Sequence, residues 1–143
     1  MQIQPYLSFN GRCEEALHFY RDQLGGQITA LMRFKENPEP PTDGALPPGL
    51  DDKVMHASIR IGDSEIMATD GGCSESSSHT FQGISLTLSV ADEAEACLRF
   101  EALAQGGQVN MPLGRTFFSP SFGVVTDRFG VNWMVIVPMP MPA

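Results

Sequence analysis

The feature that most constrains the fold of this chain is an internal repeat. Residues 14–28 and 95–109 align without a gap, and they share Glu, Leu, Phe, Gly, Gly and Gln at matching positions. In both segments apolar residues recur at the spacing of one helix face, and a Gly-Gly pair ends the helix. Nearer the end of each half, Ile66–Met67 stands opposite Trp133–Met134. The chain therefore contains one supersecondary unit written twice.

Each copy reads as a strand, a helix and three further strands. In the first half, an apolar stripe predicts a helix over residues 13–24, and strand patterns cover residues 2–9, 27–34, 54–61 and 65–69. We therefore predict an α+β fold, with two tandem βαβββ modules forming an open, barrel-like curved mixed sheet around a central cleft. The domain plan is a single domain over residues 1–143, with module one at 1–71, a linker at 72–80 and module two at 81–143.

The second half adds three local signals. Asp92 with Glu95 forms a capping box at the start of the second helix. That helix carries an apolar stripe composed of Ala96, Cys97, Phe100, Leu103 and Ala104. The carboxylate of Asp127 is expected to cap the turn before the last strand, 132–137, whose apolar residues predict that both of its faces are covered.

Composition limits the partners that this chain can take. Nine basic residues against seventeen acidic ones give a net charge of −8. Such a surface repels phosphate, so we expect neither a nucleic-acid nor a membrane partner. The sequence has neither a long apolar span nor a signal-peptide pattern, and three scattered cysteines do not form a disulfide framework. We expect a cytoplasmic protein with a proline-rich surface loop at residues 35–52.

Several short motifs resemble those of the vicinal oxygen chelate superfamily, which includes glyoxalase I, bleomycin-binding proteins and extradiol dioxygenases. They are Phe19-Tyr20 with Leu24-Gly25, and Asp127-Arg-Phe-Gly130 before the last strand. A further set resembles the PhnB-like branch: Met55-His56-Ala57, Ile66-Met67 with Asp70, Phe117-Phe118, Gly123-Val-Val-Thr-Asp127 and Trp133. The resemblance implies the duplicated fold and a homodimer, which exposed strand edges would favour. Some relatives carry a quinone methyltransferase label, but no Gly-rich turn follows a strand here to hold a nucleotide-type cofactor.

The resemblance also implies a test for a metal. Metal-dependent relatives place four ligands on the first and last strands of the modules, and these positions fall near Pro5, Met67, Ser85 and Met134. None of them suits a hard divalent ion, since proline offers no donor and thioether sulfur prefers soft ions. We therefore expect no metal and no cofactor. His56 is the best remaining ligand candidate, but no second histidine or carboxylate stands at a ligand-like spacing.

The leading hypothesis for function is metal-independent binding of a small organic molecule in the inter-module cleft. One alternative is a metal-dependent lyase, isomerase or dioxygenase-type enzyme with an off-pattern site that includes His56. Another is a protein-interaction module without a small-molecule site. The predicted ligand-binding residues are Tyr6, His56, Ser58, Arg60, Met67, Phe118, Trp133 and Met134.

The roles expected of these residues differ. Phe118 and Trp133 would stack on the ligand, Met67 and Met134 would adapt to it, and His56 or Arg60 would fix a polar end. Strand alternation separates two of them, because Trp133 and Met134 are neighbours and so point to opposite faces of the sheet. We expect His56, Met67 and Met134 to line one cavity, with Phe117 or Phe118 at its mouth.

Overall fold

The computed structural model describes residues 1–37, 49, 51–71 and 81–139. The predicted linker, 72–80, and most of the proline-rich loop, 38–48 and 50, lie outside these described residues. The chain divides into two compact units, residues 1–79 and 80–143.

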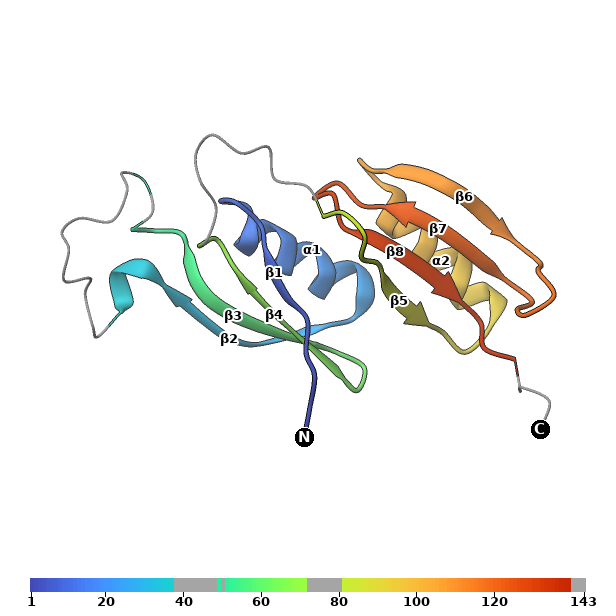
Figure 1. Cartoon of the computed structure of the whole chain (residues 1–143), viewed down its shortest axis with the longest axis horizontal. Helices are drawn as coiled ribbons and strands as arrows, with labels where there is room; N and C mark the ends of the chain where they lie inside the picture. Colours follow the sequence, from blue (N-terminus) through green and yellow to red (C-terminus); the bar gives the residue numbers. More distant parts are fainter. Residues whose placement is uncertain (38–48, 50, 72–80, 140–143) are drawn as a thin grey trace. The chain divides into compact units, whose positions relative to one another are not determined.

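Unit 1 is a four-stranded sheet with one helix on one face (Figure 1). Its strands lie in the order β1-β4-β3-β2, with β1 parallel to β4 and the other pairs antiparallel. A single 3₁₀ turn, η1, follows β2. The element bounds are β1 Tyr6–Ser8, α1 Cys13–Leu24, β2 Gln27–Arg33, η1 Phe34–Glu36, β3 Val54–Ile61 and β4 Ser64–Thr69.

Unit 2 has the same topology as unit 1. Its strands lie in the order β5-β8-β7-β6, again with the first strand of the unit parallel to the last. The element bounds are β5 Leu86–Ser89, α2 Glu93–Ala104, β6 Gln108–Gly114, β7 Phe122–Thr126 and β8 Asn132–Ile136. The predicted α+β fold of two βαβββ modules is therefore confirmed. The first strand of unit 1, predicted over residues 2–9, covers only Tyr6–Ser8.

The repeated Gly-Gly pair has the same physical role in both units. Gly25 and Gly106 have φ angles of 70° and 75°, in the left-handed region that side chains disfavour. The second glycine of each pair lies against the neighbouring strand. A Cβ on Gly26 would stand 2.9 Å from the Ile59 side chain, and one on Gly107 would overlap the Thr126 carbonyl oxygen. Both glycines of each pair are thus required for the chain to leave the helix and enter the next strand.

The two helices begin differently. The Asp92 carboxylate accepts a hydrogen bond from the Glu95 amide at 2.8 Å, as the capping box predicts for α2. In α1 the cap position is Arg12, whose side chain makes no capping bond. The carboxylate of Asp70, which directly follows β4, takes that role by accepting from the Cys13 amide at 2.9 Å. The first helix is therefore fixed by the last strand of its own unit.

Each sheet buries the face that its helix covers. In unit 1 the buried strand residues of that face are Leu7, Ala57, Ile59, Ile66 and Ala68, and α1 buries Cys13, Ala16, Leu17, Tyr20 and Leu24. In unit 2 they are Gly123, Val125, Trp133 and Val135, beneath Ala96, Phe100, Ala102 and Leu103 of α2. Along β8 the residues between these are only half-buried within the unit, so the expected cover on both faces is not found there. None of the described helices is long and apolar enough to cross a membrane.

Candidate functional site

The face of the first sheet that α1 does not cover carries most of the predicted site. Strand pairing sets Tyr6 opposite Met67, and Met67 opposite Ser58. Residues directly opposite one another on paired strands point to the same side. His56 and Arg60 stand two residues before and after Ser58 on β3, and so share its face. Five of the eight predicted ligand-binding residues therefore lie together on what we call the open face of unit 1.

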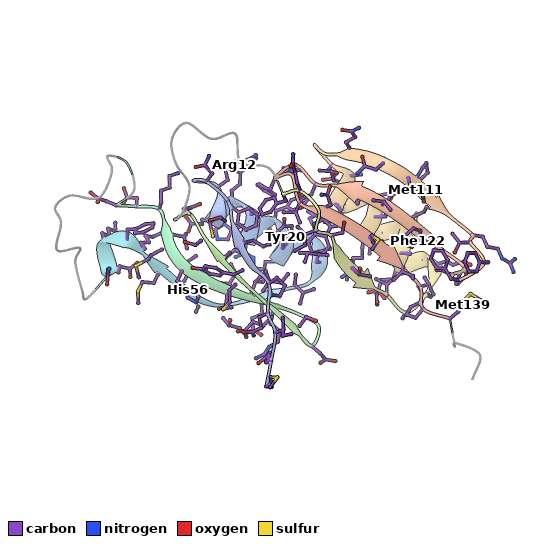
Figure 2. All side chains as sticks on the ribbon, in the orientation of Figure 1. Arg12, Tyr20, His56, Met111, Phe122 and Met139 are labelled. Carbon is purple, nitrogen blue, oxygen red and sulfur yellow. The ribbon has the colours of Figure 1, made fainter. Side chains whose placement is uncertain are left out.

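Two rings approach each other at one end of this open face. The ring centroids of Tyr6 and His56 are 5.9 Å apart, and the ring planes are tilted by 33°. Because β4 runs between β1 and β3, the two side chains lean towards each other across it. Figure 2 labels His56 on β3. Among the residues that the structure describes, neither imidazole nitrogen has a hydrogen-bond partner. This histidine can therefore still bond to a ligand.

Ser58 occupies the middle of the open face. It is only 6% exposed, and its neighbours across the paired strands are Met67 and Ala30. Within the described ranges its hydroxyl has no hydrogen-bond partner. A buried hydroxyl normally finds one, because leaving it unpaired costs about 1–3 kcal/mol. A polar ligand atom at this position would satisfy it.

Arg60 marks the other end of the open face. Its side chain is exposed, and it stands opposite Glu65 on β4 and Gln27 on β2. No ion pair or hydrogen bond joins the guanidinium to another group in the described part of the chain. The open face thus has a ring pair at one end, a buried hydroxyl in the middle and a cation at the other end.

In unit 2 the predicted site residues Met134 and Trp133 point to opposite faces of the sheet. Met134 lies on the face that α2 leaves uncovered, opposite Thr87 and Val124. Trp133 points to the α2 side, is 2% exposed, and donates from Nε1 to the Asp127 carboxylate at 2.9 Å. The stacking role expected for Trp133 does not agree with this position, because alternation along β8 turns the indole into the core of its own unit. Trp133 is therefore a core residue of unit 2.

Three phenylalanines form a continuous cluster in unit 2. The ring centroids of Phe117 and Phe118 are 5.1 Å apart, those of Phe118 and Phe122 are 5.0 Å apart, and both contacts are edge-to-face. Phe117 is 94% exposed and Phe118 is also exposed, while Phe122 (labelled in Figure 2) is half-buried at the start of β7. Phe118 therefore keeps an accessible aromatic face, as a stacking residue requires.

The donors on the open face of unit 1 do not fit a divalent metal ion. The described residues include no group of three or more histidine, cysteine, aspartate or glutamate side chains that could hold one. On this face only His56 offers a nitrogen ligand, and the nearest carboxylate by register, Glu65, is opposite Arg60 at the other end. A catalytic zinc site needs three protein ligands.

A second feature of unit 1 was not found from the sequence. A cavity of about 370 Å³ opens beside the start of α1, lined by Gly11, Glu14, Arg33, Asp52, Lys53, Val54 and Asp70. Arg33 binds both carboxylate oxygens of Glu14, at 2.7 and 3.2 Å, and this lowers the pKa of Glu14. Lys53 donates to the Gly11 carbonyl at 3.0 Å. Glu14 and Arg33 are thus bonded to each other, and Lys53 and Asp70 are bonded to backbone groups, which is typical of a structural network.

The cysteines that the structure describes do not provide an activated thiolate. Burial, followed by the charges of Asp70 and Glu14, raises the pKa of Cys13 to about 12. The Glu101 carboxylate, which accepts from the Cys97 thiol at 3.5 Å, raises the pKa of that exposed cysteine. Both thiols are therefore protonated at neutral pH, and a nucleophilic role is disfavoured. Cys97 belongs to the predicted apolar stripe, which would bury it in the core, but the structure places it on the solvent side of α2.

Comparisons with known proteins identify relatives over almost the whole chain. The family model described as 3-demethylubiquinone-9 3-methyltransferase matches residues 1–136. Protein YjdN of Escherichia coli (strain K12) is 36% identical over 147 residues, and the match covers 99% of each chain.

Solved structures agree with this assignment. Protein PA1353 from Pseudomonas aeruginosa is 44% identical, with a TM-score of 0.84 over 98% of this chain and 99% of that one. A putative 3-demethylubiquinone-9 3-methyltransferase, the PhnB protein from Bacillus cereus, is 31% identical, with a TM-score of 0.78 over 96% and 99%. A glyoxylase/bleomycin resistance protein/dioxygenase domain from Frankia sp. EAN1pec shares the fold, at 15% identity and a TM-score of 0.63 over 97% and 98%.

Proposed function

We propose that this chain, which belongs to the 3-demethylubiquinone-9 3-methyltransferase family in its PhnB-like branch, binds a small, partly apolar organic molecule without a metal ion. The proposed site is the open face of unit 1. The observation that carries the proposal is a set of polar groups, without hydrogen-bond partners among the described residues, beside apolar groups on a single sheet face. His56, Ser58 and Arg60 supply the polar groups, and Tyr6 and Met67 supply the apolar ones.

Chemistry at the positions that hold metal in related folds supports the metal-independent reading. Met67 stands on the open face of unit 1, and Met134 on the corresponding face of unit 2. Thioether side chains are flexible and polarisable, so they can adapt to ligands of irregular shape, and they are poor ligands for hard divalent ions.

A ligand screen with matched variants tests this proposal. Small aromatic and heteroaromatic molecules are screened for binding by saturation-transfer NMR, with the protein in a buffer that contains a metal chelator. Molecules that bind are then titrated by calorimetry. We expect His56→Ala to weaken binding by about 1–3 kcal/mol, the scale of a lost buried hydrogen bond. His18→Ala is the control, because His18 is an exposed histidine on α1 of the same unit.

Two results would contradict the proposal. The first is an equal effect of His56→Ala and His18→Ala on every hit. The second is the presence of about one zinc, nickel, manganese or iron per chain in protein purified without chelator, lost on His56→Ala, which would favour the off-pattern metalloenzyme instead. Elemental analysis of the purified wild type and of both variants distinguishes these readings.

We also propose that the protein is a cytoplasmic homodimer with no nucleic-acid or membrane partner. The edge strands β2 and β6 carry exposed apolar side chains, among them Met32, Val109 and Met111, which would gain stability from burial in an interface. Analytical ultracentrifugation of the wild type and of Met111→Glu tests the dimer. A wild type that sediments as a monomer at all concentrations would rule it out. Cell fractionation tests the compartment.

A further inference from the structure

We infer that the ligand of the open face of unit 1 is an aromatic carboxylate, with its ring beside Tyr6 and His56 and its carboxylate on Ser58 and Arg60. This inference rests on the proposed function and adds the chemical class of the ligand to it. It is carried by three observations on one sheet face: a ring pair, a buried hydroxyl without a partner in the described residues, and an arginine that is unpaired there.

The order of these groups along β3 sets the shape of the ligand. His56, Ser58 and Arg60 are two residues apart in turn, so each step along the strand is about 6.6 Å. Arg60 has a long, flexible side chain that can fold back towards the Ser58 row. An elongated molecule can therefore place its ring at the row of His56 and its polar group one row further on.

The chemistry of the polar end favours a carboxylate. An arginine guanidinium only donates hydrogen bonds, and its fork binds the two oxygens of a carboxylate side by side. The Ser58 hydroxyl can donate to one of the same oxygens and would then gain the partner that it lacks. A neutral carbonyl would satisfy only part of this donor set.

The charges of Glu65 and Arg60 should have opposite effects on the affinity for a carboxylate ligand. Glu65 stands directly opposite Arg60 in the strand register, and no ion pair joins the two within the described residues. Its carboxylate repels an anionic ligand at this end of the face. Removing that charge should therefore strengthen carboxylate binding, whereas removing the charge of Arg60 should weaken it.

The experiment compares two probes of similar size and shape, the anionic phenylbutanoate and the neutral phenylbutanamide, in which an NH₂ donor replaces one acceptor oxygen. Their dissociation constants are measured by calorimetry for the wild type, Arg60→Gln, Glu65→Gln, Ser58→Ala and Arg21→Gln. Arg21→Gln is the control, because it removes the same charge from an exposed position on α1. Circular dichroism spectra verify that each variant is folded.

For the wild type we expect phenylbutanoate to bind about 10–100-fold more tightly than phenylbutanamide, the range of a hydrogen bond to a charged group. Arg60→Gln should abolish this preference, Ser58→Ala should reduce it, and Glu65→Gln should increase it. Arg21→Gln should leave it unchanged.

Failure of this inference is distinguishable from failure of the proposed function. Equal binding of both probes, with no effect of Arg60→Gln, would overturn the carboxylate and leave a neutral ligand on the same face. If neither probe binds, the ligand class is wrong. The proposed function then depends on the wider screen, where the His56→Ala and His18→Ala pair decides it. If Arg60→Gln and Arg21→Gln weaken phenylbutanoate equally, the effect is one of overall charge and the inference also fails.

Discussion

The Asp70 carboxylate should be among the most sensitive side chains in unit 1. It is 4% exposed, and it accepts three backbone hydrogen bonds: Oδ1 from Gly11 at 2.8 Å and Cys13 at 2.9 Å, and Oδ2 from Val54 at 3.0 Å. It therefore joins the start of α1 to the start of β3. The amide of Asn in the variant Asp70→Asn retains one acceptor oxygen, so its NH₂ group must face at least one of these N–H donors.

The cost can be worked from these contacts. One lost hydrogen bond to a charged group costs about 1.5–3 kcal/mol, and the donor left unpaired adds to it. A negative charge at a helix N-terminus contributes a further 0.3–1 kcal/mol or so, which Asn removes. The wild-type carboxylate is buried at some cost of its own, which offsets part of the loss. We expect Asp70→Asn to lower the free energy of unfolding by about 3 kcal/mol, a large share of the total stability of a typical domain.

Urea unfolding followed by circular dichroism measures this effect. With a slope of about 1–3 kcal/mol per molar urea, the midpoint for unit 1 should fall by roughly 1–3 M. Asp92→Asn is the matched control, since it removes the same charge from an exposed cap where Asn is an equally good capping residue. If Asp70→Asn costs no more than Asp92→Asn, the assignment of Asp70 as the cap of α1 is refuted.

Three other predictions follow from single contacts. The pKa of Glu14 is lowered by its bond to Arg33, so the pair stabilises the fold above the ordinary pKa of 4.5, and this contribution is lost as the pH falls through the lowered value. The stability difference between the wild type and Glu14→Gln should thus vanish in acid, and a difference that is the same at pH 7 and pH 3 would contradict the assignment. A Cβ on Gly123 would stand 2.7 Å from the Phe100 ring, so Gly123→Ala should cost about 1–3 kcal/mol in urea unfolding, and an unchanged midpoint would contradict this close packing. Trp133→Phe leaves a buried carboxylate oxygen without its indole donor and should cost about 1–3 kcal/mol by the same assay, and a neutral result would argue against that hydrogen bond.

Features set by near neighbours in the chain were predictable from the sequence. The bounds of β3 agree with the prediction because its apolar and polar residues alternate. Asp127 accepts from the Phe129 and Val131 amides, as the turn chemistry of its sequence indicates. The duplication could be detected in the sequence because the chain must leave each helix through the same left-handed turn and close strand contact, which require a Gly-Gly pair in both units.

Features that depend on distant contacts were not predictable. The gapless repeat pairs Phe19 with Phe100, yet the buried aromatic residue of α1 is Tyr20, one position later. A helix turns by about 100° per residue, so such a slip changes which side chain enters the core. The same one-residue slip explains Cys97, which the repeat aligns with the buried Ala16 but which is exposed on α2. Identity at aligned positions therefore did not fix the packing of the helices.

Only the part of the candidate site that lies on a single strand was predictable from the sequence. Alternation places His56, Ser58 and Arg60 on one face without reference to other strands. Their relation to Tyr6 and Met67 depends on the register of three strands, which the sequence leaves open. The cavity beside Glu14 and Arg33 was missed because its lining comes from segments far apart in the chain.

The different caps of the two helices have a consequence for the order of folding. The cap of α2 lies next to it in the chain, so it is available as soon as that segment is made. The cap of α1 is 57 residues away from the amide that it binds, and closing a loop of this length costs entropy before any bond is gained. The first helix should therefore become stable only after β4 has joined the sheet. Kinetic φ-values would show this as values near zero for Ala16→Gly in α1 and higher values for Ala94→Gly in α2. During synthesis on a ribosome, α1 would therefore emerge before α2 but become stably folded after it.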